Sequence, residues 1–312
     1  MVDSLSVVIP VYRSAGNLNL LVDELEKVLP ALAAQYEIIL VDDGSPDQSW
    51  EAIQALVQVN PRVRGFTLMR NYGQHNALLC GIRQAQYEII VTMDDDLQNP
   101  PDQIHKLLDK LAEGYDVVYG TPQREQHGLW RDLASQVTKL ILQGSMGVDI
   151  ARSVSAFRAM RTQVRDAFID YRSAYVSIDV LLTWGTTRFA AVQVQHDPRR
   201  YGTSNYTLRK LIRHALNMIT GFSTLPLQLA SLVGFALAVF GILVLVYVIG
   251  RALLFGIVVP GFAFLASIVA IFSGAQLFAL GVIGEYVARI HFRTMDRPVY
   301  TVRAATDEHQ DT

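Results

Sequence analysis

Short apolar runs alternate with helix-spaced apolar residues along roughly the first 200 positions of the chain. Buried strands are predicted for 6–9, 37–41, 63–69, 88–93 and 116–119. Apolar residues three and four positions apart predict helices over 18–32, 50–57, 74–84 and 101–112. Such alternation is typical of an α/β fold with a mostly parallel, Rossmann-like sheet and helices on both faces.

Polar residues follow each predicted strand at the end where open parallel sheets bind ligands. These segments are 10–13, 42–45, 70–73, 94–96 and 120–124. A single Asp-Gly turn is ordinary turn chemistry, but five polar segments along one edge predict a binding site. Within it, Asp42 and Asp43 are placed to accept hydrogen bonds from a base or from ribose hydroxyls.

Asp94, Asp95 and Asp96 bring three carboxylates together directly after an apolar strand. Carboxylates this close repel one another unless a cation lies among them. Oxygen ligands without a nearby His or Cys favour Mg²⁺ or Mn²⁺. A solvated acidic turn is the alternative. A cation at Asp96 with arginines nearby suits a diphosphate, so the edge is a candidate metal-assisted nucleotide-diphosphate site.

Several classes of protein are disfavoured by composition and by missing motifs. The formal net charge of −2 gives no overall basic character, so nucleic acid is not an expected partner. Neither a Gly-x-Gly-x-x-Gly dinucleotide turn nor a P-loop is present. The one cysteine, Cys80, lies in an apolar run and is interpreted as a packed thiol.

Two long stretches, 215–250 and 252–284, contain no charged residue. Each exceeds the roughly 20 residues that cross a bilayer core, and we predict spans near 225–250 and 261–284. Basic residues on both outer flanks place both ends of the chain in the cytoplasm. Between 204 and 222, apolar and basic residues occupy opposite helical faces, which favours an interfacial helix over an ordinary packed one.

The predicted organisation therefore has four parts. Residues 1–202 form a cytoplasmic catalytic domain, and 203–224 form the interfacial helix region. Residues 225–284 form a two-helix transmembrane hairpin, and 285–312 form a cytoplasmic tail. We therefore expect a multi-pass protein of the inner (plasma) membrane, with the lipid bilayer as one of its partners.

Motifs along nearly the whole chain resemble the family 2 glycosyltransferases of GT-A fold, and more narrowly the polyprenyl-phosphate glycosyltransferases. They are the opening strand 6–12, the turn 41–45, the segments 70–77 and 94–101, and the stretches 199–206 and 274–286. The resemblance implies transfer of a sugar from a nucleotide-sugar donor, UDP-linked, to a polyprenyl-phosphate acceptor such as undecaprenyl phosphate. Direct in-line attack by that phosphate at the anomeric carbon predicts inversion of its configuration. The pathway implied is modification of cell-envelope glycans, lipid A or O-antigen.

The resemblance also implies roles for individual residues. The metal would be bound by Asp96 and Gln98 with Asp94. The nucleotide site would contain Pro10, Tyr12, Asp42, Asp43 and Asp94. The catalytic set would be Asp94, Asp96, Arg124 and Arg131, and the lipid phosphate would lie at Arg131, Arg199, Ser204 and Asn205.

The chain departs from the family pattern at a few positions. Arg13 and Ser14 stand where Asn and Glu are usual, and Asn205 replaces the usual Lys. Asp95, where Ala is usual, is interpreted as a solvated spectator. A catalytically silent membrane adaptor is the alternative function. A processive polysaccharide synthase is disfavoured because the chain has no Gln-x-x-Arg-Trp motif. Small residues in the spans favour a homo-oligomer.

Overall fold

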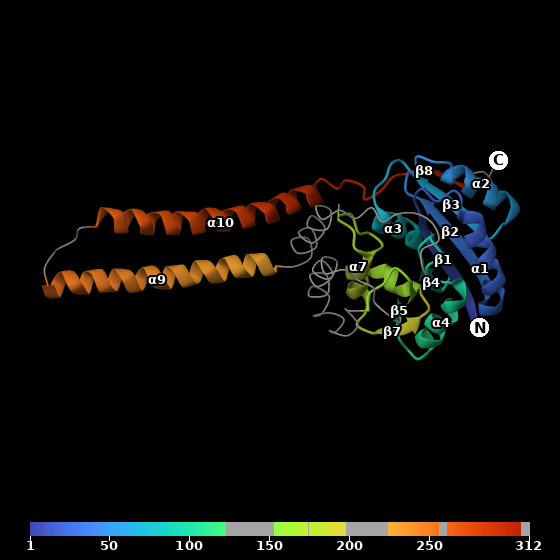
Figure 1. Cartoon of the computed structure of the whole chain (residues 1–312), viewed down its shortest axis with the longest axis horizontal. Helices are drawn as coiled ribbons and strands as arrows, with labels where there is room; N and C mark the ends of the chain where they lie inside the picture. The colour runs from blue at the N-terminus through green and yellow to red at the C-terminus, as the bar shows by residue number, and fades with distance from the viewer. Residues whose placement is uncertain (123–152, 174, 198–223, 256–260, 307–312) are drawn as a thin grey trace. The chain divides into compact units, whose positions relative to one another are not determined.

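The structure is a computed structural model in which residues 1–122, 153–173, 175–197, 224–255 and 261–306 are described. The chain divides into two compact units, one formed by 1–212 with 296–312 and the other by 213–295. The first unit contains an α/β sheet, and the second contains two long helices (Figure 1).

In the described part of the chain, the first unit is built on an eight-stranded sheet with the order β7-β5-β6-β4-β1-β2-β3-β8. The neighbours β4, β1, β2 and β3 are parallel, as are β5 and β7, whereas β6 and β8 run antiparallel to their neighbours. The strands are β1 (Val2–Val11), β2 (Ala33–Asp42), β3 (Val63–Leu68), β4 (Ile89–Thr92), β5 (Val117–Pro122), β6 (Arg158–Arg161), β7 (Phe189–Val194) and β8 (Val302–Ala305). The mostly parallel sheet predicted from the sequence is confirmed.

Helices cover both faces of this sheet (Figure 1). They are α1 (Leu18–Leu32), α2 (Ser49–Val59), α3 (Gln74–Gln84), α4 (Ile104–Ala112) and α7 (Ile178–Gly185), with 3-10 turns at Pro101–Gln103 and Thr162–Phe168. Because successive strand residues point to opposite faces, Val7 joins the core that α1 and α4 complete. Val8 lies against α3, where a Cβ on Gly81 would be 2.4 Å from the Val8 side chain.

Three strands, β6, β7 and β8, were not predicted. β6 and β8 each have four residues and join the sheet antiparallel, so neither gives an apolar run long enough to detect. β8 lies in the segment that the sequence analysis treats as a tail. The long-range pairing with β3, rather than local pattern, makes it a strand.

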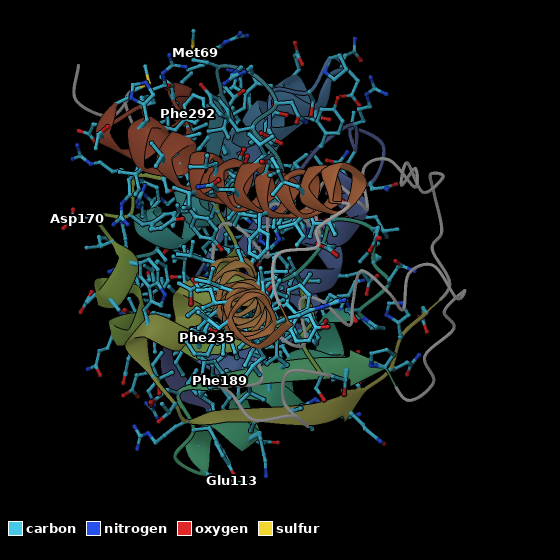
Figure 2. All side chains as sticks on the ribbon, turned by 90° about the vertical axis from the view of Figure 1, so that its left-hand side faces the viewer. Met69, Glu113, Asp170, Phe189, Phe235 and Phe292 are labelled. Carbon is cyan, nitrogen blue, oxygen red and sulfur yellow. The ribbon has the colours of Figure 1, made fainter. Side chains whose placement is uncertain are left out.

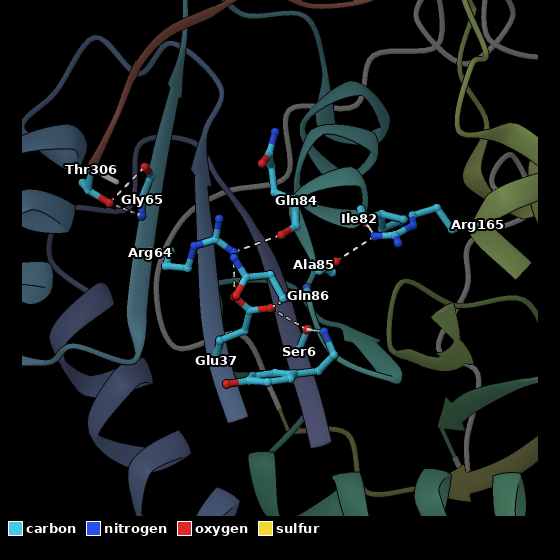
Figure 3. A network of polar contacts seen from close by, with 11 residues as sticks. Ser6, Glu37, Arg64, Gly65, Ile82, Gln84, Ala85, Gln86, Arg165 and Thr306 are labelled. Carbon is cyan, nitrogen blue, oxygen red and sulfur yellow. Dashed lines mark hydrogen bonds and ion pairs between the residues drawn. The ribbon is translucent and has the colours of Figure 1, made fainter. Parts of the chain in front are cut away.

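A buried ion pair between Glu37 and Arg64 fixes α3 against the sheet (Figure 3). The Glu37 carboxylate accepts hydrogen bonds from Arg64 Nη1 at 2.7 Å, from Ser6 Oγ at 2.7 Å and from the Gln86 N–H at 2.8 Å. Arg64 also donates to the Gln84 carbonyl at the end of α3, at 2.9 Å. Since a buried charge is stable only when paired and hydrogen-bonded, this network sets the position of α3.

The second unit is a pair of helices, α9 (Leu225–Phe255) and α10 (Phe262–Thr294). They contain stretches of 26 residues (Pro226–Arg251) and 24 residues (Ile271–Thr294) that are long and apolar enough to cross a membrane. Large apolar side chains such as Phe235 and Phe292 are exposed on them (Figure 2). Both predicted spans are helical, and the second helix continues to Thr294.

Candidate active site

The carboxyl ends of β4, β1 and β2 lie next to one another at one edge of the sheet. Beyond the regular ladders, the Met93 N–H donates to the Val8 carbonyl at 3.2 Å and the Asp43 N–H donates to the Val11 carbonyl at 2.9 Å. Pro10 is buried in β1 opposite Val41 of β2. The fold therefore brings together all of the predicted nucleotide and metal residues, namely Pro10, Tyr12, Asp42, Asp43, Asp94, Asp96 and Gln98.

Asp42 closes the turn after β2 and is 1% exposed. Its Oδ1 accepts a hydrogen bond from the Ser45 N–H at 3.0 Å, and its Oδ2 accepts one from the Thr67 hydroxyl at 2.7 Å. Both carboxylate oxygens therefore have partners inside the protein. The observed role of Asp42 is to hold the turn, and its direct contact with a nucleotide stays a prediction.

The Asp43 carboxylate joins the turn after β2 to the loop after β3. It accepts hydrogen bonds from the N–H groups of Tyr72 at 2.7 Å and Gly73 at 2.8 Å. Burial raises the pKa of Asp43 to about 6, although these two N–H groups favour its ionised form. The next residue, Gly44, has φ +63°, and a Cβ there would be 2.5 Å from the Arg70 carbonyl carbon. Only glycine fits this approach.

The acidic turn after β4 forms the other part of the candidate site. Asp94 Oδ1 accepts a hydrogen bond of 2.6 Å from Nε2 of Gln74, in the first turn of α3. Asp96 is 8% exposed, and its Oδ1 accepts a hydrogen bond from the Gln98 N–H at 3.2 Å. Leu97, which lies between Asp96 and Gln98, has a φ of +57°, a conformation that costs a non-glycine residue about 1–2 kcal/mol. The surrounding contacts hold Asp94 and Asp96 on this strained turn.

Asp95 is not the solvated spectator that the sequence analysis predicted. Its Oδ2 lies 3.4 Å from the Tyr12 N–H, and the Ser14 side chain hydrogen-bonds the carboxylate. Burial raises the pKa of Asp95, and the charge of neighbouring Asp96 raises it further. The prediction was wrong because a sequence does not show that the loop after β1 lies against the turn after β4.

Tyr12 remains accessible beside this contact. It is 40% exposed, and the Arg13 guanidinium lies 5.3 Å from the centre of its ring. The Arg13 N–H donates to Ser45 Oγ at 3.1 Å, which ties the loop after β1 to the turn after β2. An exposed aromatic ring with a cation beside it offers a stacking surface for a planar group such as a nucleobase.

The metal donor set predicted from the sequence consists only of oxygen ligands, which suits Mg²⁺ or Mn²⁺. Among the described residues, no group of three or more His, Cys, Asp or Glu side chains is placed to hold a metal. Mg²⁺ is commonly bound by one or two carboxylates together with substrate phosphates. Asp94 and Asp96 therefore fit an ion shared with a diphosphate better than one enclosed by protein.

The chain after β7 is attached to the acidic turn, and sequence reasoning missed this. The Asp197 N–H donates to the Gln98 carbonyl at 2.8 Å, and a ring nitrogen of His196 lies 3.3 Å from Asn99 Oδ1. Arg199, predicted to contact the lipid phosphate, follows two residues later. Predicted residues outside the described part are Arg124, Arg131, Arg199, Ser204 and Asn205, together with the interfacial helix, and their roles stay predictions.

A second missed feature is a buried ion pair directly behind the acidic turn. Arg158, which is 1% exposed, pairs with Asp179 of α7, and its Nε donates to Thr92 Oγ1 at 3.1 Å. Thr92 is the last residue of β4, two positions before Asp94. The Tyr119 hydroxyl donates to Asp179 at 3.1 Å and completes the cluster. No local sequence signal could have revealed it, because its members come from four separate elements.

Comparison with known proteins gives the family. Residues 6–168 match the family described as glycosyl transferase family 2. This chain belongs to glycosyl transferase family 2. The undecaprenyl-phosphate 4-deoxy-4-formamido-L-arabinose transferase of Proteus mirabilis (strain HI4320) is 36% identical over 306 residues, 97% of this chain and 94% of that protein. The protein of the same name from Yersinia pestis (strain Pestoides F) is 35% identical over 315 residues, 99% of this chain and 95% of that protein.

The solved structures of two synthases share the fold. Mannosyl-3-phosphoglycerate synthase from Rubrobacter xylanophilus has a TM-score of 0.52 at 17% identity, covering 69% of this chain and 71% of its own. Glucosyl-3-phosphoglycerate synthase from Mycobacterium tuberculosis, in complex with Mn²⁺, UDP and phosphoglyceric acid, has a TM-score of 0.52 at 18% identity. The match covers 70% of this chain and 76% of that protein. The GT-A-like architecture implied by the sequence is confirmed, and this family 2 member is a glycosyltransferase.

Proposed function

We propose that this glycosyltransferase moves a sugar from a UDP-linked donor to the phosphate of a polyprenyl lipid such as undecaprenyl phosphate. The observation that carries the proposal is the match to undecaprenyl-phosphate 4-deoxy-4-formamido-L-arabinose transferases over 97–99% of this chain. That match extends past the catalytic domain into the two apolar helices. A lipid-linked acceptor would explain those helices, since its phosphate lies at a membrane surface and the helices would hold the catalytic domain there.

The donor would bind at the edge formed by the loops after β1, β2 and β4. Accessible Tyr12 would stack on the base, and Asp94 and Asp96 would bind Mg²⁺ or Mn²⁺ together with the diphosphate. Support for this arrangement comes from the structurally similar glucosyl-3-phosphoglycerate synthase, which was crystallised with Mn²⁺ and UDP. When bound, the ion would neutralise charge on the departing nucleoside diphosphate.

The acceptor needs little activation by the protein. A phosphate monoester has its second pKa near 6 and is largely dianionic at neutral pH, so no strong general base is required. The protein's task is to bring two anionic groups together. Arg124 and Arg131 would contact the phosphates, with Arg199 and Ser204 at the lipid, because a guanidinium can contact phosphate through two hydrogen bonds. Direct in-line attack at the anomeric carbon would invert its configuration.

The membrane arrangement is also part of the proposal. Helices α9 and α10 would cross the inner membrane, and the basic residues on both flanks would keep the catalytic domain and both chain ends in the cytoplasm. Residues 203–224 would lie along the membrane surface as an amphipathic helix. The protein would act as a homo-oligomer through its membrane helices.

A transfer assay tests the proposal. Full-length protein in detergent is incubated with undecaprenyl phosphate, Mg²⁺ or Mn²⁺ and a panel of UDP-sugars that includes the 4-deoxy-4-formamido-L-arabinose donor. We expect metal-dependent glycolipid whose anomeric configuration is opposite to that of the donor. Asp96→Asn should reduce the rate by about a hundredfold or more, a size typical of losing one electrostatic contact to developing charge.

Asp102→Asn is the matched control, because Asp102 is an exposed acidic residue six positions further along the chain. It should leave the rate unchanged. A product that keeps the donor's anomeric configuration would contradict the proposed direct attack. Absence of transfer from every donor, with UDP binding intact, would favour the silent adaptor instead.

A further inference from the structure

The segment that follows α10 returns to the sheet beside the candidate donor site. We call residues Asp296–Thr306 the C-terminal strap. Its strand β8 pairs with β3, with Thr67 opposite Ala304 and Leu68 opposite Val302, and the register shifts between these two pairs. Irregularities of this kind bend a strand and re-aim its neighbours.

Just beyond this pairing, the strap reaches the loop formed by residues 70–73. The Met69 N–H donates to the Thr301 carbonyl at 2.9 Å, and Arg303 Nη2 donates to the Met69 carbonyl at 3.0 Å. The side chain and the backbone of Thr301 lie close enough to the Tyr72 phenol to lower its pKa through hydrogen bonding. The Arg70 guanidinium lies 4.6 Å from the centre of the Tyr72 ring.

Tyr72 links the strap to the acidic turn after β2. Its N–H and that of Gly73 hold the Asp43 carboxylate at 2.7 and 2.8 Å. Thr67, which pairs with the strap, donates to Asp42 at 2.7 Å. The groups that hold both carboxylates are therefore themselves held by the strap.

The geometry points to Thr301 as a positioning residue for donor binding, acting through Tyr72 on the loop 70–73 and the Asp42–Ser45 turn. This inference rests on the proposed nucleotide site. It makes donor affinity depend on the segment that follows the second membrane helix, a part of the chain far from every predicted site residue in sequence. The strap is anchored elsewhere as well, by the Arg172–Asp296 ion pair at 3.0 Å and by Tyr300 beside Arg83.

The strap contains its own matched control. Thr306 is a second threonine whose hydroxyl is also hydrogen-bonded to β3, accepting from the Gly65 N–H at 2.9 Å and lying 3.3 Å from the Gly65 carbonyl (Figure 3). Gly65 is near the start of β3, away from the loop 70–73. Thr301→Val and Thr306→Val each remove one hydroxyl from the same strap, but only the first removes a contact with the loop.

The experiment is calorimetric titration of full-length protein in detergent with UDP in the presence of Mn²⁺. Thr301→Val should weaken UDP binding by about threefold to tenfold, the range for one lost hydrogen bond, while Thr306→Val leaves it unchanged. Thr301→Ser, which keeps the hydroxyl, should restore wild-type affinity. Tyr72→Phe breaks the contact from the other side, and adding Thr301→Val to it should cause no further loss.

Equal effects of Thr301→Val and Thr306→Val on UDP affinity would overturn the inference, because both would then act through strap stability alone. A further loss when Thr301→Val is added to Tyr72→Phe would also overturn it. If Thr301→Val does not fold, the UDP affinities of Tyr72→Phe and Thr306→Val are compared instead, and equal losses in these two variants would overturn the inference. Wild-type protein that binds no UDP would instead refute the proposed donor site, so the two failures are distinguishable.

Discussion

The side-chain amide of Gln74 donates a hydrogen bond of 2.6 Å to the Asp94 carboxylate. Gln74 is the first residue of α3, and α3 is fixed at its other end by the Glu37–Arg64 pair. The acidic turn is thus oriented by the first residue of a helix whose opposite end is fixed to the sheet. Asp94 is held before any ligand arrives, which reduces the entropy that binding must remove.

We predict that Gln74→Ala lowers kcat/KM for glycolipid formation by about tenfold, because it removes a hydrogen bond to a charged group. The melting temperature should change little, since Gln74 is exposed. Gln54→Ala is the control, because Gln54 is an exposed glutamine on α2. Steady-state kinetics of the three proteins check this, and equal rates would show that Asp94 needs no such support.

The contact between Asp95 and the loop after β1 gives a second prediction. Asp95→Ala should raise the KM for the UDP-sugar by about threefold to tenfold, because Tyr12 would lose its link to the acidic turn. The double variant Ser14→Glu/Asp95→Ala supplies the carboxylate from the opposite side of the same contact. It should recover most of the lost affinity, because Ser14 and Asp95 touch.

The measurement is donor KM for the wild type, the single variant and the double variant at saturating lipid. Asp95→Asn serves as the control, since an amide oxygen can still accept the Tyr12 N–H. A double variant no better than Asp95→Ala would mean that the carboxylate acts through something other than this contact.

Asp43 gives a prediction about pH. Its pKa of about 6 in the folded protein lies above the ordinary value of 3.8, so between these values the folded state holds a proton that the unfolded state has lost. The contribution of Asp43 to the free energy of unfolding is therefore fully present below about pH 4 and is lost as pH rises through about 6. This contribution is at most about 3 kcal/mol. Wild-type protein should lose melting temperature relative to Asp43→Asn between pH 4 and pH 7. Parallel melting curves for both proteins across this range would contradict the assignment.

A comparison of two glycines can distinguish the effect of a strained backbone conformation from the effect of a close contact between two loops. Gly44 and Gly114 both have positive φ, but a Cβ on Gly44 would meet the Arg70 backbone at 2.5 Å, whereas nothing lies within 4 Å of one on Gly114. Gly114→Ala should cost about 1 kcal/mol or more of unfolding free energy and leave UDP affinity unchanged. Gly44→Ala should cost more and weaken UDP binding, because the loop after β3 must move away. Denaturation and UDP titration of both variants test this, and equal effects would count against a role for that approach.

Sequence patterns predicted the parallel core of the sheet because each of those strands is a continuous apolar run bounded by turn residues. They also predicted that the candidate site residues lie together at one edge of the sheet, since strand direction fixes where the carboxyl ends lie, and the structure brings those residues together there. They failed for β8 and for Asp95. In both cases the deciding partner lies tens to hundreds of positions away along the chain. The local sequence does not show whether a segment such as β8 pairs with a sheet, or whether a carboxylate such as that of Asp95 is hydrogen-bonded inside the protein or solvated.

The amino-acid sequence by itself determined the family, the alternation of strands and helices, the two apolar helices and the acidic turn, because each depends on residues that are close together along the chain. The tertiary structure decided how the site is held. It showed that Asp42 and Asp43 are satisfied inside the protein, that Asp95 joins two loops, and that a strap from the end of the chain reaches Tyr72. These are contacts between distant segments, and only packing of the folded chain brings such groups within hydrogen-bonding distance.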